Sequence, residues 1–151
     1  MEENKTMIKT LKAQAKWIQG TKIESETRGL KIIIDKPLEE NGTNLGPKPA
    51  ELSLEALGGC ILFAYLYAAE KLRVDIEDLK VDLEGDVVPG GWTDEQNIKR
   101  AGFKQVRFIV QVKTNNSKEK IEQVHQLAQK VSPMFDNFSH SVKLEGTFSI
   151  L

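Results

Sequence analysis

Cys60 is the residue whose type and position most directly suggest chemistry. It is the single cysteine of the chain, and it follows Gly58 and Gly59 within an apolar segment. A glycine inside a helix costs about 1 kcal/mol, so the pair indicates that another backbone or a substrate comes close to the thiol. The alternative stays open, because a free cysteine is among the most buried residue types and is usually an inert part of a core.

A thiol that reacts as a thiolate needs a cation beside it. A free thiol, with a pKa of about 8.5, is mostly protonated at neutral pH, and apolar surroundings raise a thiol's pKa further. Arg28, next to Gly29, is the best candidate for this cation; its alternative is a solvated arginine in a turn. Arg73 and Arg107 are fallbacks. Arg73 lies too far along the same predicted helix, at about 1.5 Å per residue.

The element that must position Cys60 is a helix predicted over residues 49–73. Pro49 in the first turn and Glu51 soon after it are typical of a helix start. The centre of this segment, ALGGCILFAYLYAA, is apolar on all sides. It has 14 residues where a membrane span needs about 20, so we expect a buried core helix.

The other elements follow from hydrophobic periodicity. A meander of three strands, a loop, the central helix, two further strands, a second helix and a final strand are predicted in that order. The second helix begins at a cap on Asn116 or Ser117, and Pro133 ends or kinks it. A break in the fifth strand near Gln105 indicates a bulge. The strands are expected at residues 7–18, 22–27, 30–35, 78–88, 103–113 and 141–151.

This βββ-α-ββ-α-β order predicts an α+β fold with a mainly antiparallel sheet. A length of 151 residues predicts a single domain over 1–151. One sheet covers only one side of a helix that is apolar all round, so the rest of the helix must meet a second subunit. The sequence therefore predicts an obligate homodimer with a buried central helix.

Composition excludes several classes of function. Lys and Arg total 21 against 22 Asp and Glu, which does not indicate a nucleic-acid binder. One cysteine rules out an internal disulfide and a Cys-rich zinc site, and two histidines argue against a His-based metal centre. We expect no metal and no cofactor. The N-terminus has no apolar signal region, so the protein is expected to be cytoplasmic, without a membrane segment.

The segment GPKPAELSLEALGGC, residues 46–60, resembles a signature of the OsmC/Ohr family of thiol-dependent hydroperoxide reductases. The run from Gly29 to Asp35 resembles the family's third strand and the aspartate that closes it. With the order of elements, the resemblance extends from about Lys12 to Ile150. It implies an intertwined α+β homodimer with two active sites at the subunit interface.

The resemblance also implies roles for residues. The cysteine at the position of Cys60 attacks the peroxide as a thiolate and becomes a sulfenic acid. An arginine, for which Arg28 is our candidate, holds the thiolate and the peroxide oxygen, and a glutamate orients that arginine. In the family a second cysteine then forms a disulfide, which a dithiol reduces.

Two positions depart from the family pattern. Ser132, before Pro133, stands where the resolving cysteine is expected, so an intramolecular disulfide cannot form. Ala50 stands where the orienting glutamate is expected, and Glu51 comes one residue later. On an ideal helix Glu51 is roughly 180° from Cys60, so it either caps the helix or pairs across the dimer. The pattern resembles a divergent, OsmC-like branch of the family.

We therefore interpret the chain as a stress-response dimer that reduces organic hydroperoxides at Cys60, with an external thiol as reductant. Gly58, Gly59 and Tyr67 are expected to line the pocket. Tyr67 shares the helical face of Cys60, and core packing is its alternative. The rival interpretation is a catalytically impaired dimer that binds a small apolar ligand or senses redox state. His125 is expected on the surface.

Overall fold

A computed structural model describes residues 7–88 and 100–151. The chain forms two compact units, residues 1–52 and 53–151, and each is described separately. The α+β class with antiparallel sheets is confirmed. A single domain over 1–151 stays a prediction.

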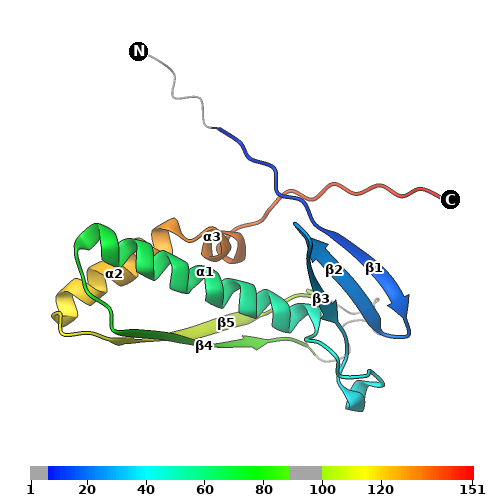
Figure 1. The fold of residues 1–151 in the computed structure, drawn as a ribbon, viewed down its shortest axis with the longest axis horizontal. Helices are drawn as coiled ribbons and strands as arrows, with labels where there is room; N and C mark the ends of the chain where they lie inside the picture. The colour runs from blue at the N-terminus through cyan, green and yellow to red at the C-terminus, as the bar shows by residue number, and fades with distance from the viewer. Residues whose placement is uncertain (1–6, 89–99) are drawn as a thin grey trace. The chain divides into compact units, whose positions relative to one another are not determined.

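The first unit contains a three-stranded antiparallel meander, drawn in blue in Figure 1. Its strands are β1 (Gln14–Gln19), β2 (Lys22–Thr27) and β3 (Leu30–Ile34). Arg28 and Gly29 form the two-residue turn between β2 and β3, and both have positive φ, 53° and 80°. Such backbone angles are those of a type I′ hairpin turn. Residues 7–13 were expected in the first strand and lie outside it.

A buried carboxylate organises the loop that follows β3. Asp35, 1% exposed, accepts hydrogen bonds from the hydroxyls of Thr21 and Thr43 and from the backbone N–H groups of Lys36, Thr43 and Leu45. The Thr21 and Thr43 hydroxyls are the main reason that the pKa of Asp35 lies well below its usual range. The ionised carboxylate therefore ties this loop, which includes the short 3₁₀ helix η1 (Leu38–Glu40), to the meander.

The helix α1 (Pro49–Leu72) begins at the end of the first unit, and most of its length belongs to the second. The carboxylate of Glu51 accepts a hydrogen bond of 2.8 Å from the backbone N–H of Lys48. This bond satisfies one of the donors that the first turn of a helix leaves unpaired. Of the two roles predicted for Glu51, helix capping is the one seen within the chain.

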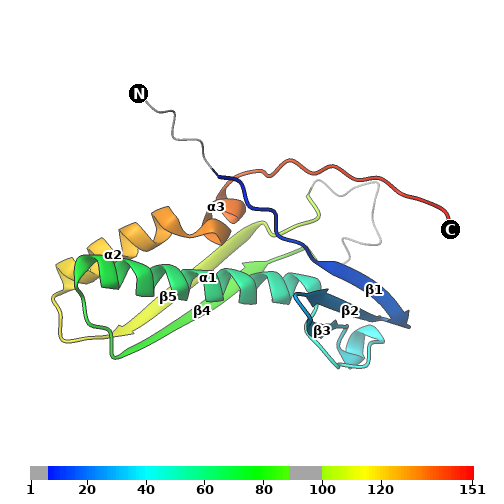
Figure 2. The same ribbon diagram turned by 45° about the horizontal axis from the view of Figure 1, so that its top comes forward.

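The second unit packs helices on one face of a two-stranded sheet (Figure 2). Besides α1 it contains β4 (Asp78–Asp86), β5 (Gln105–Lys113), α2 (Lys118–Val131) and α3 (Pro133–Ser139). The β4–β5 ladder is antiparallel and continuous, so the predicted bulge near Gln105 is wrong; the strand begins there. Alternate residues of both strands face the helices, as their period of two requires.

Residues of α1 and α2 form the centre of this core. By length and composition α1 could cross a membrane, but its buried residues belong to the core cluster, as in a soluble protein. Gly58 is buried because α1 touches β4 there: a Cβ on Gly58 would lie 2.8 Å from Leu83 Cδ1. The buried core residues are Leu57, Ile61, Ala64, Tyr65, Ala68, Ala69, Val74, Val124 and Ala128.

The second predicted helix is present, with the Ser117 side chain as its N-cap. It ends at Val131, and Pro133 starts the separate helix α3. His125 was expected on the surface, but it is half-buried, because α2 turns it toward Tyr65, whose hydroxyl it contacts. Burial raises the pKa of Tyr65 to about 12.

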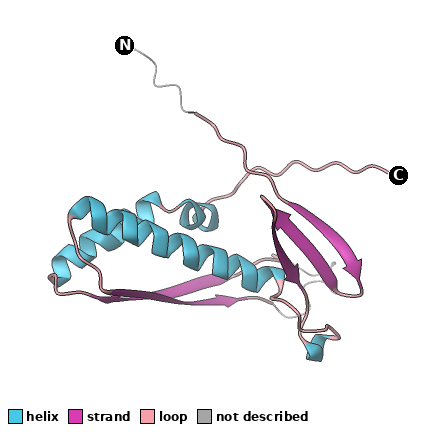
Figure 3. Cartoon of the chain, in the orientation of Figure 1, coloured by secondary structure: helices cyan, strands magenta, loops and turns pink. Residues whose placement is uncertain are grey.

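The final strand predicted over residues 141–151 is wrong for this chain: the segment is loop (Figure 3). It alternates as a strand should, but its apolar side chains are exposed, including Leu144 at 91% and Ile150 at 91%. A strand needs a neighbour for its backbone hydrogen bonds, and the described residues pair it with none. One face of α1 is also exposed, with Phe63 at 78%, Leu66 at 51% and Tyr67 at 47%.

Candidate functional site

Two donors converge on the sulfur of Cys60. The hydroxyl of Ser132 lies 3.3 Å from Cys60 Sγ, and the backbone N–H of Met134 lies 3.5 Å from it. Ser132 is 2% exposed, and its oxygen also accepts a hydrogen bond from the N–H of Phe135. With its lone pair occupied in this way, the Ser132 hydroxyl directs its proton to the sulfur. Both groups are therefore positioned to donate hydrogen bonds to the sulfur.

The junction of α2 and α3 places these donors. Pro133 cannot continue α2 because it lacks an N–H and clashes with the preceding turn. Ser132 therefore leaves the helical conformation, with φ −75° and ψ 112°, and becomes the N-cap of α3. This geometry turns the side chain at the predicted resolving-cysteine position toward Cys60. The family pattern identified position 132 from the sequence. The second donor, the backbone N–H of Met134, is a group that no side-chain pattern could indicate.

The sulfur opens onto an apolar depression of about 280 Å³. Tyr67, predicted to share the face of Cys60, lines it. Phe63 lines it too, and sequence reasoning missed this residue although it lies one helical turn after Cys60. None of the lining residues carries a charge. They are Cys60, Phe63, Ala64, Tyr67, Val131 and Pro133.

Gly58 and Gly59 differ in their surroundings. Gly58 is packed against the side chains of Leu83 and Val81 of β4, so the close approach that the sequence predicted there is made by the sheet. A Cβ on Gly59 would meet nothing within 4 Å among the described residues. Gly59 is exposed and next to Cys60, which leaves this side of the helix open to a substrate or a second chain.

The candidate cations have different environments. Arg107 is held by Glu84, at 3.1 Å, and by Asp86, at 2.5 Å, and these carboxylates raise its pKa. Arg73 directly follows α1. Arg28 is exposed in the β2–β3 turn of the first unit. Both Arg28 and Arg73 have positive φ, 53° and 54°, which non-glycine residues rarely adopt, so this feature does not distinguish them.

Glu51 and Arg28 both lie in the first unit. Among the residues that the structure describes, no ion pair joins them. The carboxylate of Glu51 is bonded instead to the start of its own helix. Within one chain, therefore, Glu51 does not hold the Arg28 guanidinium.

Over residues 7–88 and 100–151, no group of three or more His, Cys, Asp or Glu side chains is arranged to hold a metal ion. The chemistry available at the described site is that of a thiol with two hydrogen-bond donors beside an apolar surface.

The sequence model of the family described as OsmC-like protein matches residues 42–146. No curated protein matches the sequence. The fold is similar to that of an OsmC-like protein from Mycoplasma pneumoniae, with a TM-score of 0.77, 18% identity, and coverage of 89% of this chain and 91% of that one.

Two further solved structures share the fold. One is an organic hydroperoxide resistance protein OsmC from Legionella pneumophila, with a TM-score of 0.66, 20% identity, and coverage of 88% of this chain and 91% of that one. The other is an organic hydroperoxide resistance protein from Elizabethkingia anophelis, with a TM-score of 0.68, 15% identity, and coverage of 90% and 92%. At these identities the likeness concerns the fold.

Proposed function

Because the chain belongs to the OsmC-like protein family, we propose that it reduces organic hydroperoxides through the thiolate of Cys60. The observation that carries this proposal is the pair of donors on Cys60 Sγ, from Ser132 and Met134, at the edge of an apolar depression. The donors stabilise a negative sulfur, and the depression suits the organic group of a hydroperoxide. A role related to peroxide stress follows from the family and from the hydroperoxide resistance proteins that share its fold.

The first step is displacement at the peroxide O–O bond. The thiolate attacks the terminal oxygen of ROOH, the O–O bond breaks, and the products are Cys60–SOH and RO⁻, which takes a proton to become ROH. The sulfur is oxidised and the peroxide is reduced by two electrons. The Ser132 hydroxyl and the Met134 N–H hold the thiolate in place until the attack.

An external thiol must complete the cycle, because the chain has no second cysteine. One molecule of R′SH condenses with Cys60–SOH to give a mixed disulfide and water. A second R′SH displaces Cys60 as a thiol and leaves as R′SSR′. The open side of the depression gives the reductant access to the sulfur. We place this activity in the cytoplasm, where thiols are kept reduced.

The cation that this chemistry needs is proposed to be Arg28. The depression lacks charge, Arg107 is already bound by two carboxylates, and Arg28 sits exposed on a tight turn. We propose that Glu51 orients Arg28 across the dimer, the role that the family resemblance implies for a glutamate near the start of this helix. Within one chain, the described residues show no ion pair between them.

We propose that the assembled protein is a homodimer. The apolar face of α1 around Phe63 and the alternating segment 141–151 are both exposed in the single chain. Soluble proteins rarely expose large contiguous apolar patches unless a partner covers them. A second copy would cover the helix face and could supply the strand neighbour that residues 141–151 lack.

The apolar, uncharged lining of the depression also favours a second function, in which an impaired protein binds a small apolar ligand or senses redox state. The deciding experiment is consumption of cumene hydroperoxide with excess dithiothreitol. We expect turnover by the native protein, loss of it in Cys60→Ser, and near-native turnover in the control Ser139→Ala, an exposed serine of α3. Equal background rates for the native protein and Cys60→Ser would overturn the peroxidase proposal and favour the second function.

A further inference from the structure

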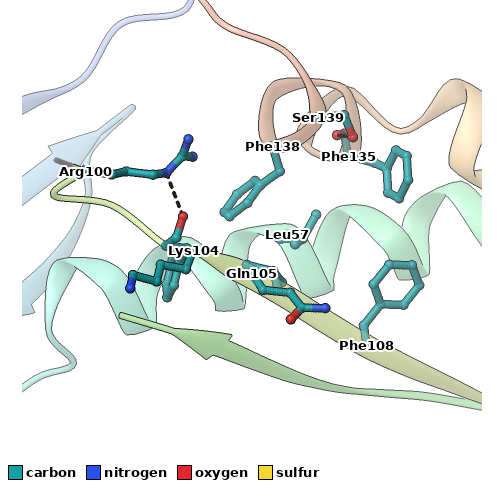
Figure 4. Close-up of a pocket in the computed structure, with 10 residues that line it drawn as sticks. Leu57, Arg100, Lys104, Gln105, Phe108, Phe135, Phe138 and Ser139 are labelled. Carbon is teal, nitrogen blue, oxygen red and sulfur yellow. Dashed lines mark hydrogen bonds between the residues drawn. The ribbon is translucent and has the colours of Figure 1, made fainter. Parts of the chain in front are cut away.

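A second cavity, of about 270 Å³, lies in the second unit among residues of α1, of α3 and of the start of β5 (Figure 4). Cys60 does not line it, and it shares no lining residue with the depression at that cysteine. The proposed peroxide chemistry therefore makes no use of it. The lining residues that matter for its chemistry are Leu57, Arg100, Phe103, Lys104, Phe108, Phe135 and Phe138.

The walls are apolar and largely aromatic. Leu57, 2% exposed, comes from the core helix. Phe108 and Phe135 meet edge to face, with ring centroids 6.2 Å apart, and Phe103 and Phe138 lie 6.3 Å apart. Such aromatic pairs hold each other in defined positions. This aromatic part of the lining is thus a formed apolar surface, suited to an alkyl or aryl group.

The charged groups of this cavity are basic, and Gln105 and Ser139 are its neutral polar lining residues. Arg100 donates from Nε to the carbonyl of Phe103 at 2.8 Å, which fixes its guanidinium beside the aromatic wall (Figure 4). Lys104 is its neighbour in the lining, and no acidic residue is among the lining residues. Among the described residues, neither basic side chain makes an ion pair, whereas nearby Arg107 is bound by Glu84 and Asp86.

We propose that this cavity binds a small hydrophobic monocarboxylate. Its hydrocarbon part would lie among the phenylalanines, and its carboxylate would bind Arg100 and Lys104, since a guanidinium matches a carboxylate with two parallel hydrogen bonds. The volume is just below the usual range of small-molecule sites, roughly 300–1,000 Å³, so the ligand has on the order of eight carbon atoms. This site is independent of the peroxidase proposal.

The test is a titration of the full-length protein with octanoate and, separately, with octan-1-ol, followed by NMR or calorimetry. We expect octanoate to bind at least about fivefold more tightly than the alcohol, because a hydrogen bond to a charged group is worth more than one to a hydroxyl. Arg100→Gln/Lys104→Gln should weaken octanoate binding by at least about fivefold and leave octan-1-ol binding unchanged.

The control Lys118→Gln/Lys120→Gln removes the same charge from the first turns of α2, away from the cavity, and should leave octanoate binding unchanged. Cys60→Ser should also bind octanoate as the native protein does, so this site can be tested even if the peroxidase proposal fails. Equal affinity for acid and alcohol, equal weakening by both double variants, or no binding of octanoate would overturn the proposal.

Discussion

At the residue scale, the relation between Cys60 and Ser132 matters most. A hydroxyl cannot form a disulfide, but at 3.3 Å it donates a hydrogen bond to the sulfur. A chain with serine at this position therefore lacks the resolving cysteine and has a hydrogen-bond donor to Cys60 Sγ in its place. Under the proposed function, the sulfenic acid on Cys60 has no resolving cysteine and is reduced by an external thiol.

The donor role of Ser132 predicts a selective loss of rate. Ser132→Ala should slow the reaction of Cys60 with cumene hydroperoxide about tenfold, since a hydrogen bond to a charged group contributes about 1.5–3 kcal/mol. Ser132→Thr keeps the hydroxyl and should restore most of the rate. The measurement is stopped-flow consumption of peroxide in a single turnover. Equal rates in the alanine and native proteins would remove Ser132 from the mechanism.

The same geometry predicts that a cysteine at this position captures the sulfenic acid. Ser132→Cys, treated with one equivalent of peroxide, should lose both free thiols and form an intramolecular disulfide, because its sulfur would start close to Cys60. Ser139→Cys, an exposed control on α3, should form none. Thiol titration and intact mass distinguish the two. Persistent sulfenic acid in Ser132→Cys would show that the two positions are not in reach.

Sequence reasoning reached Cys60 and Ser132 because a lone cysteine and a family pattern mark them. It expected Tyr67 in the pocket and missed Phe63, although both follow Cys60 at helical spacing. The backbone donor of Met134 depends on how α3 begins beside α1, a tertiary contact that no local pattern contains.

At the element scale, the contact of α1 with β4 depends on the absence of a side chain at Gly58. Gly58→Ala would bring a Cβ to 2.8 Å from Leu83 Cδ1. Overpacking costs about 1–3 kcal/mol, which the better helix propensity of alanine, about 1 kcal/mol, offsets in part. We expect a lower free energy of unfolding in urea.

The matched variant for this contact is Leu83→Val, which shortens the opposing side chain. In the Leu83→Val background, Gly58→Ala should cost less than it does alone, by about 1 kcal/mol. If the effects of the two substitutions on the free energy of unfolding are strictly additive, the contact between Gly58 and Leu83 is contradicted.

The loop after β3 predicts a dependence of stability on pH. The pKa of Asp35 is lowered in the folded state by the Thr21 and Thr43 hydroxyls. Its stabilising contribution is therefore fully present above the unfolded pKa of about 3.9 and is lost as the pH falls toward the lower folded value. Urea midpoints measured from pH 5 to pH 2 should fall steeply below about pH 4 in the native protein and less steeply in Asp35→Asn. If the urea midpoint falls equally with pH in both proteins, Asp35 does not cause the pH dependence of stability.

Most elements were predictable because their signals are local. The Arg28–Gly29 turn, the start of α1 at Pro49 and the Ser117 cap each mark a boundary that the structure confirms. The segment 141–151 has the alternation of a strand, but pairing is a tertiary property, and the single chain provides no neighbour for it. The alternation of apolar residues breaks near Gln105 because β5 begins there. In the sequence, such a strand end looks the same as a bulge.

At the scale of the whole molecule, the exposed face of α1 predicts self-association. Phe63→Glu would bury an unpaired carboxylate in a dimer, at a cost of several kcal/mol, and should raise the dimer dissociation constant at least about 100-fold. Gln126→Glu, on the exposed surface of α2, is the control and should not change it. Sedimentation velocity gives the result. A monomeric native protein at all concentrations would contradict the dimer.

The most direct measurement is the mass of the protein after one equivalent of cumene hydroperoxide and dimedone, without added thiol. We expect one dimedone adduct, located at Cys60 by peptide mapping, and none in Cys60→Ser. Attack by the Cys60 thiolate leaves a sulfenic acid, and the chain has no second cysteine to remove it. An unmodified Cys60 after complete consumption of the peroxide, or a peroxide that is not consumed, would contradict the account.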